Sequence, residues 1–250
     1  MSFRIIYLTD PYTKGAHVTA AQEKLHQNKY GRFLKSKANI DGVYGPVTAR
    51  ATRRAKYLLG YPRKRINGSY GEQLNAYLAG TKPLPAVYRL RRRRRLAAAD
   101  KARTVRAEMV AQAMWATRRE PLVHYEQSRP MPLSQFKRHV LPLRTDCSGF
   151  CTCIAYAAGA PDPNGRKFDG LGYTGTMLSA CEHIARSEVK VGDYVVYGDG
   201  TGNHVCMVVA MDTDPLLVSH GQEAGPILIR HSAEHRAQGY AKVTWLSAGV

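Results

Sequence analysis

The sequence predicts an α+β protein in two parts, a small three-helix domain followed by a domain with an antiparallel sheet. The charge is also divided unevenly along the chain: residues 1–120 hold 26 Lys+Arg and 7 Asp+Glu, a net charge of +19, whereas residues 121–250 hold 11 and 12, a net charge of −1. Apolar residues recur at helical spacing in the first part. Short β-type runs dominate the end of the chain, and helices followed by strands are typical of an α+β domain.

An internal repeat organises the first part. The segment 40–45 (IDGVYG) recurs 26 positions later as 66–71 (INGSYG). In each copy the Asp-Gly or Asn-Gly pair favours a turn, and the last Gly releases the chain into a helix. Three predicted helices contain the apolar sets Val18, Ala21, Leu25, then Ala51, Ala55, Leu58, Leu59, then Leu74, Tyr77, Leu78. We therefore predict a three-helix domain over residues 1–82.

An Arg-rich linker is expected at residues 83–102, because Pro83 and Pro85 lead into a run with six Arg among residues 89–95. A helix is predicted from about Thr104 to Arg118, and it would begin the second domain, residues 103–250. The basic part should bind a polyanion: nucleic acid, anionic lipid or an anionic cell wall. Nucleic acid is not expected, because aromatic residues do not interleave with the Arg run and no nucleic-acid motif is found.

The second domain is predicted to open with helices and to end in strands. Asp146 is a suitable N-cap for a helix that Gly159 closes. Five β-type runs follow, separated by Gly, Asp and Pro turns: 193–197, 204–210, 216–220, 227–229 and 243–245. The run 204–210 is apolar on both faces, which indicates a central strand.

A nucleophile is predicted at Cys147, in the first turn of the helix that follows Asp146. Unpaired N–H groups and the helix dipole at that position favour the thiolate, which is the nucleophilic form. A His must then protonate the leaving amine. His204 begins one strand and His220 ends the next, so a hairpin would bring them together as base and orienter. Ser219 or His231 is an alternative orienter.

No metal and no cofactor are expected. A zinc site from Cys147, Cys151 and Cys153 would need an unusual ligand spacing and would place thiols on opposing helix faces. These last two thiols, with Cys181 and Cys206, are interpreted as core residues. Five cysteines, an odd and small number, favour a reduced compartment rather than a disulfide scaffold.

Residues 103–250 resemble the NlpC/P60 cysteine peptidases. The resemblance is carried by the Asp146–Phe150 block (DCSGF), the Val191–Val196 block (VGDYVV), the His204-Val205 strand start, His220, and the helix leading to Tyr125. It implies a papain-like α+β fold and hydrolysis of stem peptides in bacterial peptidoglycan, usually between D-γ-Glu and the diamino acid. It also implies that Asp146, Ser148 and Tyr125 shape the substrate pocket. The long insert between Tyr125 and Cys147, and Cys206 where the family has a small residue, depart from the pattern.

Residues 1 to about 80 resemble the peptidoglycan-binding type 1 domain, through Val18, Gln22, the Asp41–Gly45 block, Thr48 and the half-repeat at Asn67-Gly68. At least half of its tyrosines are expected to be core residues, and some of the others are expected to line a glycan groove. The tyrosines concerned are Tyr30, Tyr44, Tyr57, Tyr61, Tyr70 and Tyr77. No signal-peptide h-region is recognised. The combination resembles a bacteriophage endolysin, which is made in the host cytoplasm and reaches the wall through a holin.

Two rival functions stay open. The same triad could cleave the N-acetylmuramoyl-L-alanine amide, which would make the protein an amidase. The chain could also be a non-enzymatic, basic wall- or nucleic-acid-binding protein, although the joint presence of Cys147, His204 and His220 argues against this. The expected partner is peptidoglycan, bound by a soluble monomer without membrane insertion, since the apolar runs are far shorter than the roughly 20 residues of a membrane span.

Overall fold

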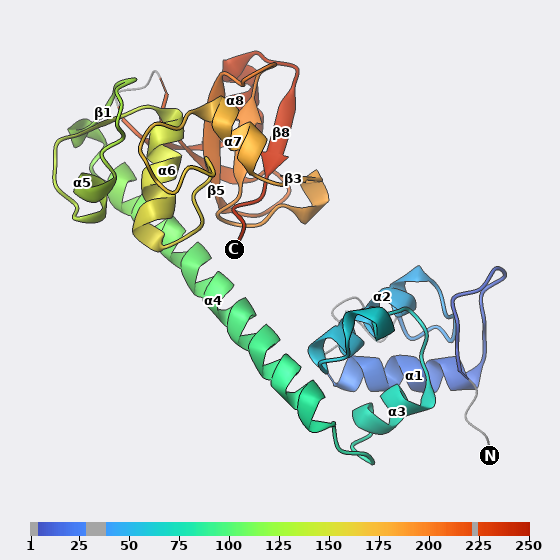
Figure 1. Ribbon diagram of the computed structural model, residues 1–250. Helices are drawn as coiled ribbons and strands as arrows, with labels where there is room; N and C mark the ends of the chain where they lie inside the picture. Colours follow the sequence, from blue (N-terminus) through green and yellow to red (C-terminus); the bar gives the residue numbers. More distant parts are fainter. Residues whose placement is uncertain (1–4, 29–38, 222–224) are drawn as a thin grey trace. The chain divides into compact units, whose positions relative to one another are not determined.

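The chain forms two compact units, Met1–Asp100 and Lys101–Val250. The structure is a computed structural model and describes residues 5–28, 39–221 and 225–250 (Figure 1). The division falls within the segment that the sequence marks as a linker. Among the described residues, no helix is long and apolar enough to cross a membrane.

Unit 1 contains the three predicted helices, α1 (Ala16–Gln27), α2 (Pro46–Leu58) and α3 (Glu72–Leu78), and a 3₁₀ turn, η2 (Arg63–Arg65). The repeat supplies its core, because Tyr44 and Tyr70 occupy equivalent places in the two copies and are both fully buried. The hydroxyl of Tyr44 lies 2.7 Å from both Thr52 Oγ1 and the carbonyl oxygen of Gly68. The repeated segment thus packs the two halves of the unit together.

The tyrosines of unit 1 are mostly core residues. Tyr44, Tyr61, Tyr70 and Tyr77 are buried. Tyr57 is 40% exposed, while Tyr30 lies outside the described residues. Four buried members agree with the expectation that at least half are core, and leave Tyr57 as the described tyrosine of this set with an accessible ring.

The Arg run is helical, which corrects the expectation of a linker followed by a helix from Thr104. Helix α4 spans Ala86–Thr117 and contains the whole run. Arg, Leu and Ala are strong helix formers, and the run holds no Gly or Pro after Pro85. Tyr88 is buried in the core of unit 1, and Arg95 donates to the carbonyl oxygens of Tyr57 and Tyr61. The start of α4 is therefore part of unit 1, and the domain is larger than three helices.

Unit 2 is built on a six-stranded antiparallel sheet with the order β3-β8-β4-β5-β6-β7. The strands are β3 (His183–Ile184), β4 (Tyr194–Tyr197), β5 (His204–Ala210), β6 (Leu216–Ser219), β7 (Ile227–Arg230) and β8 (Val243–Leu246). All five predicted runs are strands, and β5 is central, with β4 and β6 on either side. This confirms the α+β class and the antiparallel sheet.

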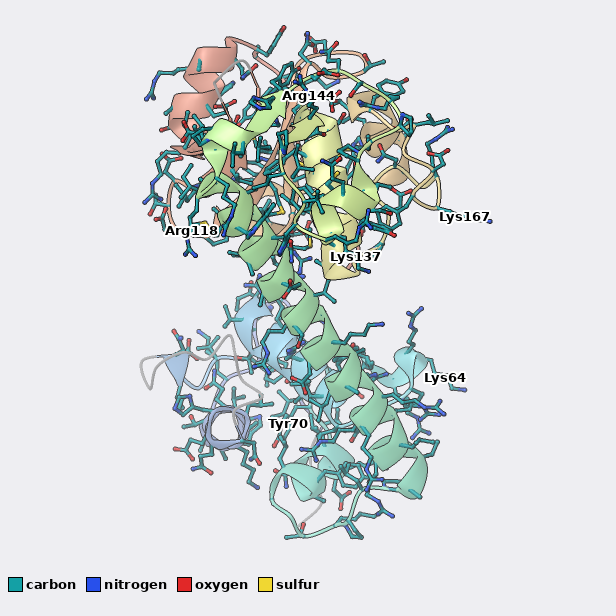
Figure 2. All side chains as sticks on the ribbon, turned by 90° about the vertical axis from the view of Figure 1, so that its left-hand side faces the viewer. Lys64, Tyr70, Arg118, Lys137, Arg144 and Lys167 are labelled. Atoms are coloured by element: carbon teal, nitrogen blue, oxygen red, sulfur yellow. The ribbon has the colours of Figure 1, made fainter. Side chains whose placement is uncertain are left out.

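The helix α6 (Cys147–Ala158) packs against β5 on one side and α5 (Leu133–Lys137) on the other (Figure 1). The core around it contains Met109, Phe136, Phe150, Ile154 and Met207, and Figure 2 shows the side chains that fill this unit. The remaining elements are η3 (Glu120–Leu122), α7 (Thr174–Ala180), η4 (Arg186–Glu188) and α8 (His231–Gln238).

A parallel strand pair, β1 (Val123–Tyr125) and β2 (Leu143–Thr145), was not expected from the sequence. Its three-residue strands are too short to give a periodic signal. The segment around Tyr125 is thus a strand and not the end of a helix. On β2, Arg144 forms an exposed ion pair with Glu126 at 2.9 Å, and Figure 2 labels this arginine.

Candidate active site

Cys147 is the first residue of α6, as predicted, and its side chain is almost fully buried. Asp146 caps the helix: its Oδ1 accepts from the backbone N–H of Gly149 at 2.6 Å and from Ser148 Oγ at 3.0 Å. Gly149 is required there, because a Cβ at this position would lie 2.3 Å from Thr145 Oγ1. The cap and the close packing fix the thiol at the positive end of the helix dipole.

Tyr125 is brought to Cys147 by the parallel strand pair. Strand β1 aligns Tyr125 with Thr145, two residues before Cys147, so the insert loops out between the two strands. Tyr125, Asp146, Cys147 and Ser148 line one cavity of about 400 Å³, which we call the Cys147 cavity. All three residues predicted to shape the pocket therefore lie beside the candidate nucleophile.

Arg129 is a residue of this cavity that the sequence analysis missed. Its Nη2 lies 2.9 Å from Asp146 Oδ2 and 3.1 Å from Ser148 Oγ, and its Nε donates to the carbonyl oxygen of Gly172 at 2.8 Å. It thus holds Oδ2 of the capping carboxylate, while Gly149 donates to Oδ1. Arg129 belongs to the Pro-rich insert, which was noted only as a departure from the family pattern.

His204 begins β5 and is buried next to three side chains that contact its Nε2. Its Nε2 lies 3.0 Å from Glu234 Oε1, 2.9 Å from Ser219 Oγ and 3.2 Å from Cys206 Sγ. A hydrogen bond with Cys147 is among the interactions that raise the pKa of His204. The structure therefore brings His204 together with both Cys147 and Glu234.

The electrostatics favour a charged His204 and a charged Glu234. Burial lowers the pKa of His204, but the adjacent Cys206 and the hydrogen bonds with Cys147, Cys206 and Glu234 outweigh it, so that this pKa lies well above its usual value. Burial alone would raise the pKa of Glu234, yet the hydrogen bond and charge of His204 lower it overall. The two groups form a buried ion pair in which each stabilises the charged form of the other.

His220 follows β6 and is fully buried against aromatic rings. Its ring lies edge-on to Tyr125, with centroids 5.7 Å apart, and 5.3 Å from the ring of Phe150. His220, the predicted orienter, therefore lies between the ring of Tyr125 and the core residue Phe150. Of the two alternatives, Ser219 contacts His204 Nε2, whereas His231 Nδ1 lies 2.8 Å from the hydroxyl of Tyr197.

Glu234 was missed because it lies on α8, a short helix that the sequence analysis did not predict. The eight residues HSAEHRAQ contain no apolar stripe, so hydrophobic periodicity gives no signal. The available signals were good helix formers and Gly239 at the end, which adopts a left-handed conformation. Glu234 also lines a second cavity of about 430 Å³ with His204, and we call it the Glu234 cavity. The two cavities share Tyr125 and Asn203.

The five cysteines are free thiols. Cys151 and Cys153 are buried in the core, as expected, whereas Cys181 is half-buried and packs against it. Burial raises the pKa of all three thiols, that of Cys181 to about 12, which disfavours the reactive thiolate. Cys206 is fully buried but differs from them, because it contacts His204 and lies 3.9 Å from Glu234 Oε1.

Comparisons with known proteins add structural likenesses only. No family model and no curated protein matches the chain. Among solved structures, the peptidoglycan hydrolase RipB (Rv1478) from Mycobacterium tuberculosis is similar over 86% of this chain and 79% of its own, with 15% identity and a TM-score of 0.37. Rv1477, a hypothetical invasion protein of the same organism, is similar over 75% and 77%, with 15% identity and a TM-score of 0.35.

Proposed function

We propose that the chain is a cell-wall hydrolase whose second unit is a cysteine peptidase with Cys147 as nucleophile, His204 as general acid and base, and Glu234, in place of His220, as orienter. The observation that carries this proposal is the position of His204, whose Nε2 lies 3.0 Å from a buried carboxylate and whose ring also bonds the thiol at the start of α6. Nucleophile, base and orienter in a hydrogen-bonded row are the signature of covalent acyl transfer.

The mechanism follows from these positions. Because Nε2 of His204 contacts Glu234, we assign the Cys147 thiol to Nδ1. The thiolate attacks the amide carbonyl, and the imidazolium of His204 gives its proton to the departing amine as the C–N bond breaks. His204 then takes a proton from water, which attacks the thioester and frees Cys147. The N–H groups at the start of α6, including that of Cys147, would stabilise the oxyanion.

The substrate is proposed to be the stem peptide of peptidoglycan, cut between D-γ-Glu and the diamino acid. Support comes from the family resemblance of the Cys147 block and from the polar lining of the Cys147 cavity. The cavity offers the hydroxyl groups of Tyr125 and Ser148 and the guanidinium of Arg129 next to the nucleophile. These groups suit a peptide rich in amides and carboxylates better than an apolar ligand.

Unit 1 is proposed to hold the wall. The charge of residues 1–120 favours an anionic polymer, and the repeat resembles a peptidoglycan-binding domain. Because Tyr88 and Arg95 pack into unit 1, its binding fragment should comprise residues 1–100 and not 1–82. We expect residues 1–100 to sediment with purified peptidoglycan without cutting it. A fragment that stays in the supernatant at low salt would contradict this assignment. An endolysin released through a holin stays a prediction.

The bond that is cut can be identified by mass spectrometry of digested wall. Endopeptidase activity releases a new amino group on the diamino acid, whereas the rival amidase releases one on L-alanine. Wild type should give the first product, and Cys147→Ser should give neither while still binding wall. Intact muropeptides after digestion with folded wild-type protein would contradict hydrolysis and favour the non-enzymatic alternative.

A further inference from the structure

Three buried side-chain atoms that could each ligate a metal lie close together on the side of His204 that faces Glu234. We propose that His204, Cys206 and Glu234 form a binding site for a thiophilic divalent cation such as Zn²⁺, and that the cation inhibits the peptidase by occupying Nε2 of the general base. The inhibition rests on the proposed function, whereas the binding site does not. The sequence analysis did not expect any metal, and for zinc it considered only the cysteines of α6.

The geometry fits a tetrahedral ion. His204 Nε2 lies 3.2 Å from Cys206 Sγ and 3.0 Å from Glu234 Oε1, and Cys206 Sγ lies 3.9 Å from the same carboxylate oxygen. Tetrahedral zinc with ordinary Zn–N, Zn–O and Zn–S lengths separates such ligand atoms by about 3.4 to 3.6 Å. Each observed distance differs from these values by about 0.4 Å or less, which small side-chain rotations can absorb.

The ligand chemistry also fits. A thiolate, an imidazole and a carboxylate are the three ligand types that zinc uses in proteins, and three protein ligands leave a fourth position for water or a hydroxyl. Ser219 Oγ lies 2.9 Å from His204 Nε2 and 3.3 Å from Glu234 Oε1, so it stands where a fourth ligand is needed. The amide of Gln238 donates to Glu234 Oε1 at 2.9 Å and would orient the carboxylate from outside the ligand set.

A metal ion can reach this site from the Glu234 cavity, and its binding would change the protonation of His204. His204 and Glu234 line the Glu234 cavity, so an ion can reach them without passing Cys147. On binding, Cys206 would release its thiol proton and His204 its Nε2 proton to solvent, so that a thiolate and an unprotonated Nε2 face the metal. The metal then replaces Glu234 as the partner of the imidazole and prevents formation of the imidazolium that must protonate the leaving amine. Cys147 is not a ligand in this arrangement.

Binding can be tested without activity by adding Co²⁺ to the full-length protein, since a thiolate bound to Co²⁺ gives a charge-transfer absorption that nitrogen and oxygen ligands do not. Wild type should bind one equivalent with this band, and Zn²⁺ should remove it. Cys206→Ser, which keeps the side-chain volume, should lose the band, while Cys147→Ser and Cys181→Ser should keep it. Circular dichroism checks that each variant is folded, and Cys206→Ala serves if the Ser variant is not.

A folded wild type without the band, a band that persists in the Cys206 variants, or a band that disappears in Cys147→Ser would overturn the site. Inhibition is measured separately on soluble muropeptides: equimolar Zn²⁺ should slow wild type at least tenfold and should leave Cys206→Ser within twofold of its metal-free rate. If the band follows Cys206 but no variant hydrolyses muropeptides, the proposed function fails and the metal site stands. If hydrolysis is normal and the band is absent, the metal site fails alone.

Discussion

Glu234→Gln tests the proposed orienter without changing any other side chain of the site. The amide keeps the size of the carboxylate and can still accept from His204 Nε2, but it removes the negative charge from a pair in which both side chains are buried. A hydrogen bond to a charged group contributes about 1.5–3 kcal/mol. If this energy is realised when the imidazolium forms, kcat/KM should fall about 10- to 150-fold. Glu234→Ala should be worse, because it leaves the buried imidazolium without its carboxylate partner.

The assay is a pH profile of kcat/KM on soluble muropeptides, with a chelator present to exclude metal. Glu234 raises the pKa of His204, so the alkaline limb of the profile should move to lower pH in Glu234→Gln. The same pair stabilises the fold: its contribution is complete between about pH 4.5 and 6.5, is lost at higher pH as the pH rises through the raised pKa of His204, and is lost at lower pH as the pH falls through the lowered pKa of Glu234. Wild type should therefore lose stability above pH 6.5, and the variant should lose less.

Two comparisons make this prediction refutable. Glu182→Gln, which changes an exposed carboxylate of the same unit, should leave the rate and the profile unchanged. His220→Gln tests the residue that the sequence analysis chose as orienter. A normal rate and profile in Glu234→Gln, together with a large loss and a shifted alkaline limb in folded His220→Gln, would show that His220 and not Glu234 orients the imidazole.

Three further predictions concern the pocket and unit 1. Arg129→Met should lower kcat/KM more than tenfold in muropeptide assays, and Arg129→Lys should restore only part of it, because an ammonium does not reproduce the planar fork of the guanidinium on Asp146 and Ser148; equal rates in all three proteins would contradict this role. Gly60→Ala should destabilise unit 1 by about 2 kcal/mol or more in denaturant unfolding, since its φ is +86° and a Cβ would lie 2.0 Å from the carbonyl oxygen of Tyr88. Gly80→Ala is the matched control, because Gly80 has φ +72° and no atom within 4 Å; it should lower the unfolding free energy by only about 1 kcal/mol. Equal losses in the two variants would mean that the start of α4 does not pack against Gly60. Burial lowers the pKa of Lys56 to about 8, so the unfolding free energy of residues 1–100 should rise between about pH 8 and 10. Lys56→Met should remove this rise. A wild-type fragment whose stability falls over this range would contradict the burial of the Lys56 ammonium group.

The elements with a strong periodic or punctuation signal were predictable. The helix from Cys147 was expected because an N-cap residue precedes it and Gly159 closes it. The central strand β5 was expected because its apolar run is continuous. These two elements carry the proposed nucleophile and the proposed base, so both candidates could be chosen from the amino-acid sequence.

The elements that the sequence analysis missed are short or polar. Strands β1 and β2 have three residues each, and their pairing, which brings Tyr125 next to Cys147, is a tertiary event without a local pattern. Helix α8 is polar because one buried carboxylate, and not an apolar stripe, anchors it to the sheet. The Arg run was interpreted from its charge, although its helix propensity was the stronger signal.

The central claim, that Cys147 performs covalent catalysis on the wall, is tested most directly by comparing wild type with Cys147→Ser in the mass spectrum of muropeptides from purified peptidoglycan. Wild type should release peptides with a new amino group on the diamino acid, and Cys147→Ser should lower their yield by orders of magnitude while keeping its fold and its binding to wall. The claim is contradicted if Cys147→Ser releases the same peptides at the wild-type rate.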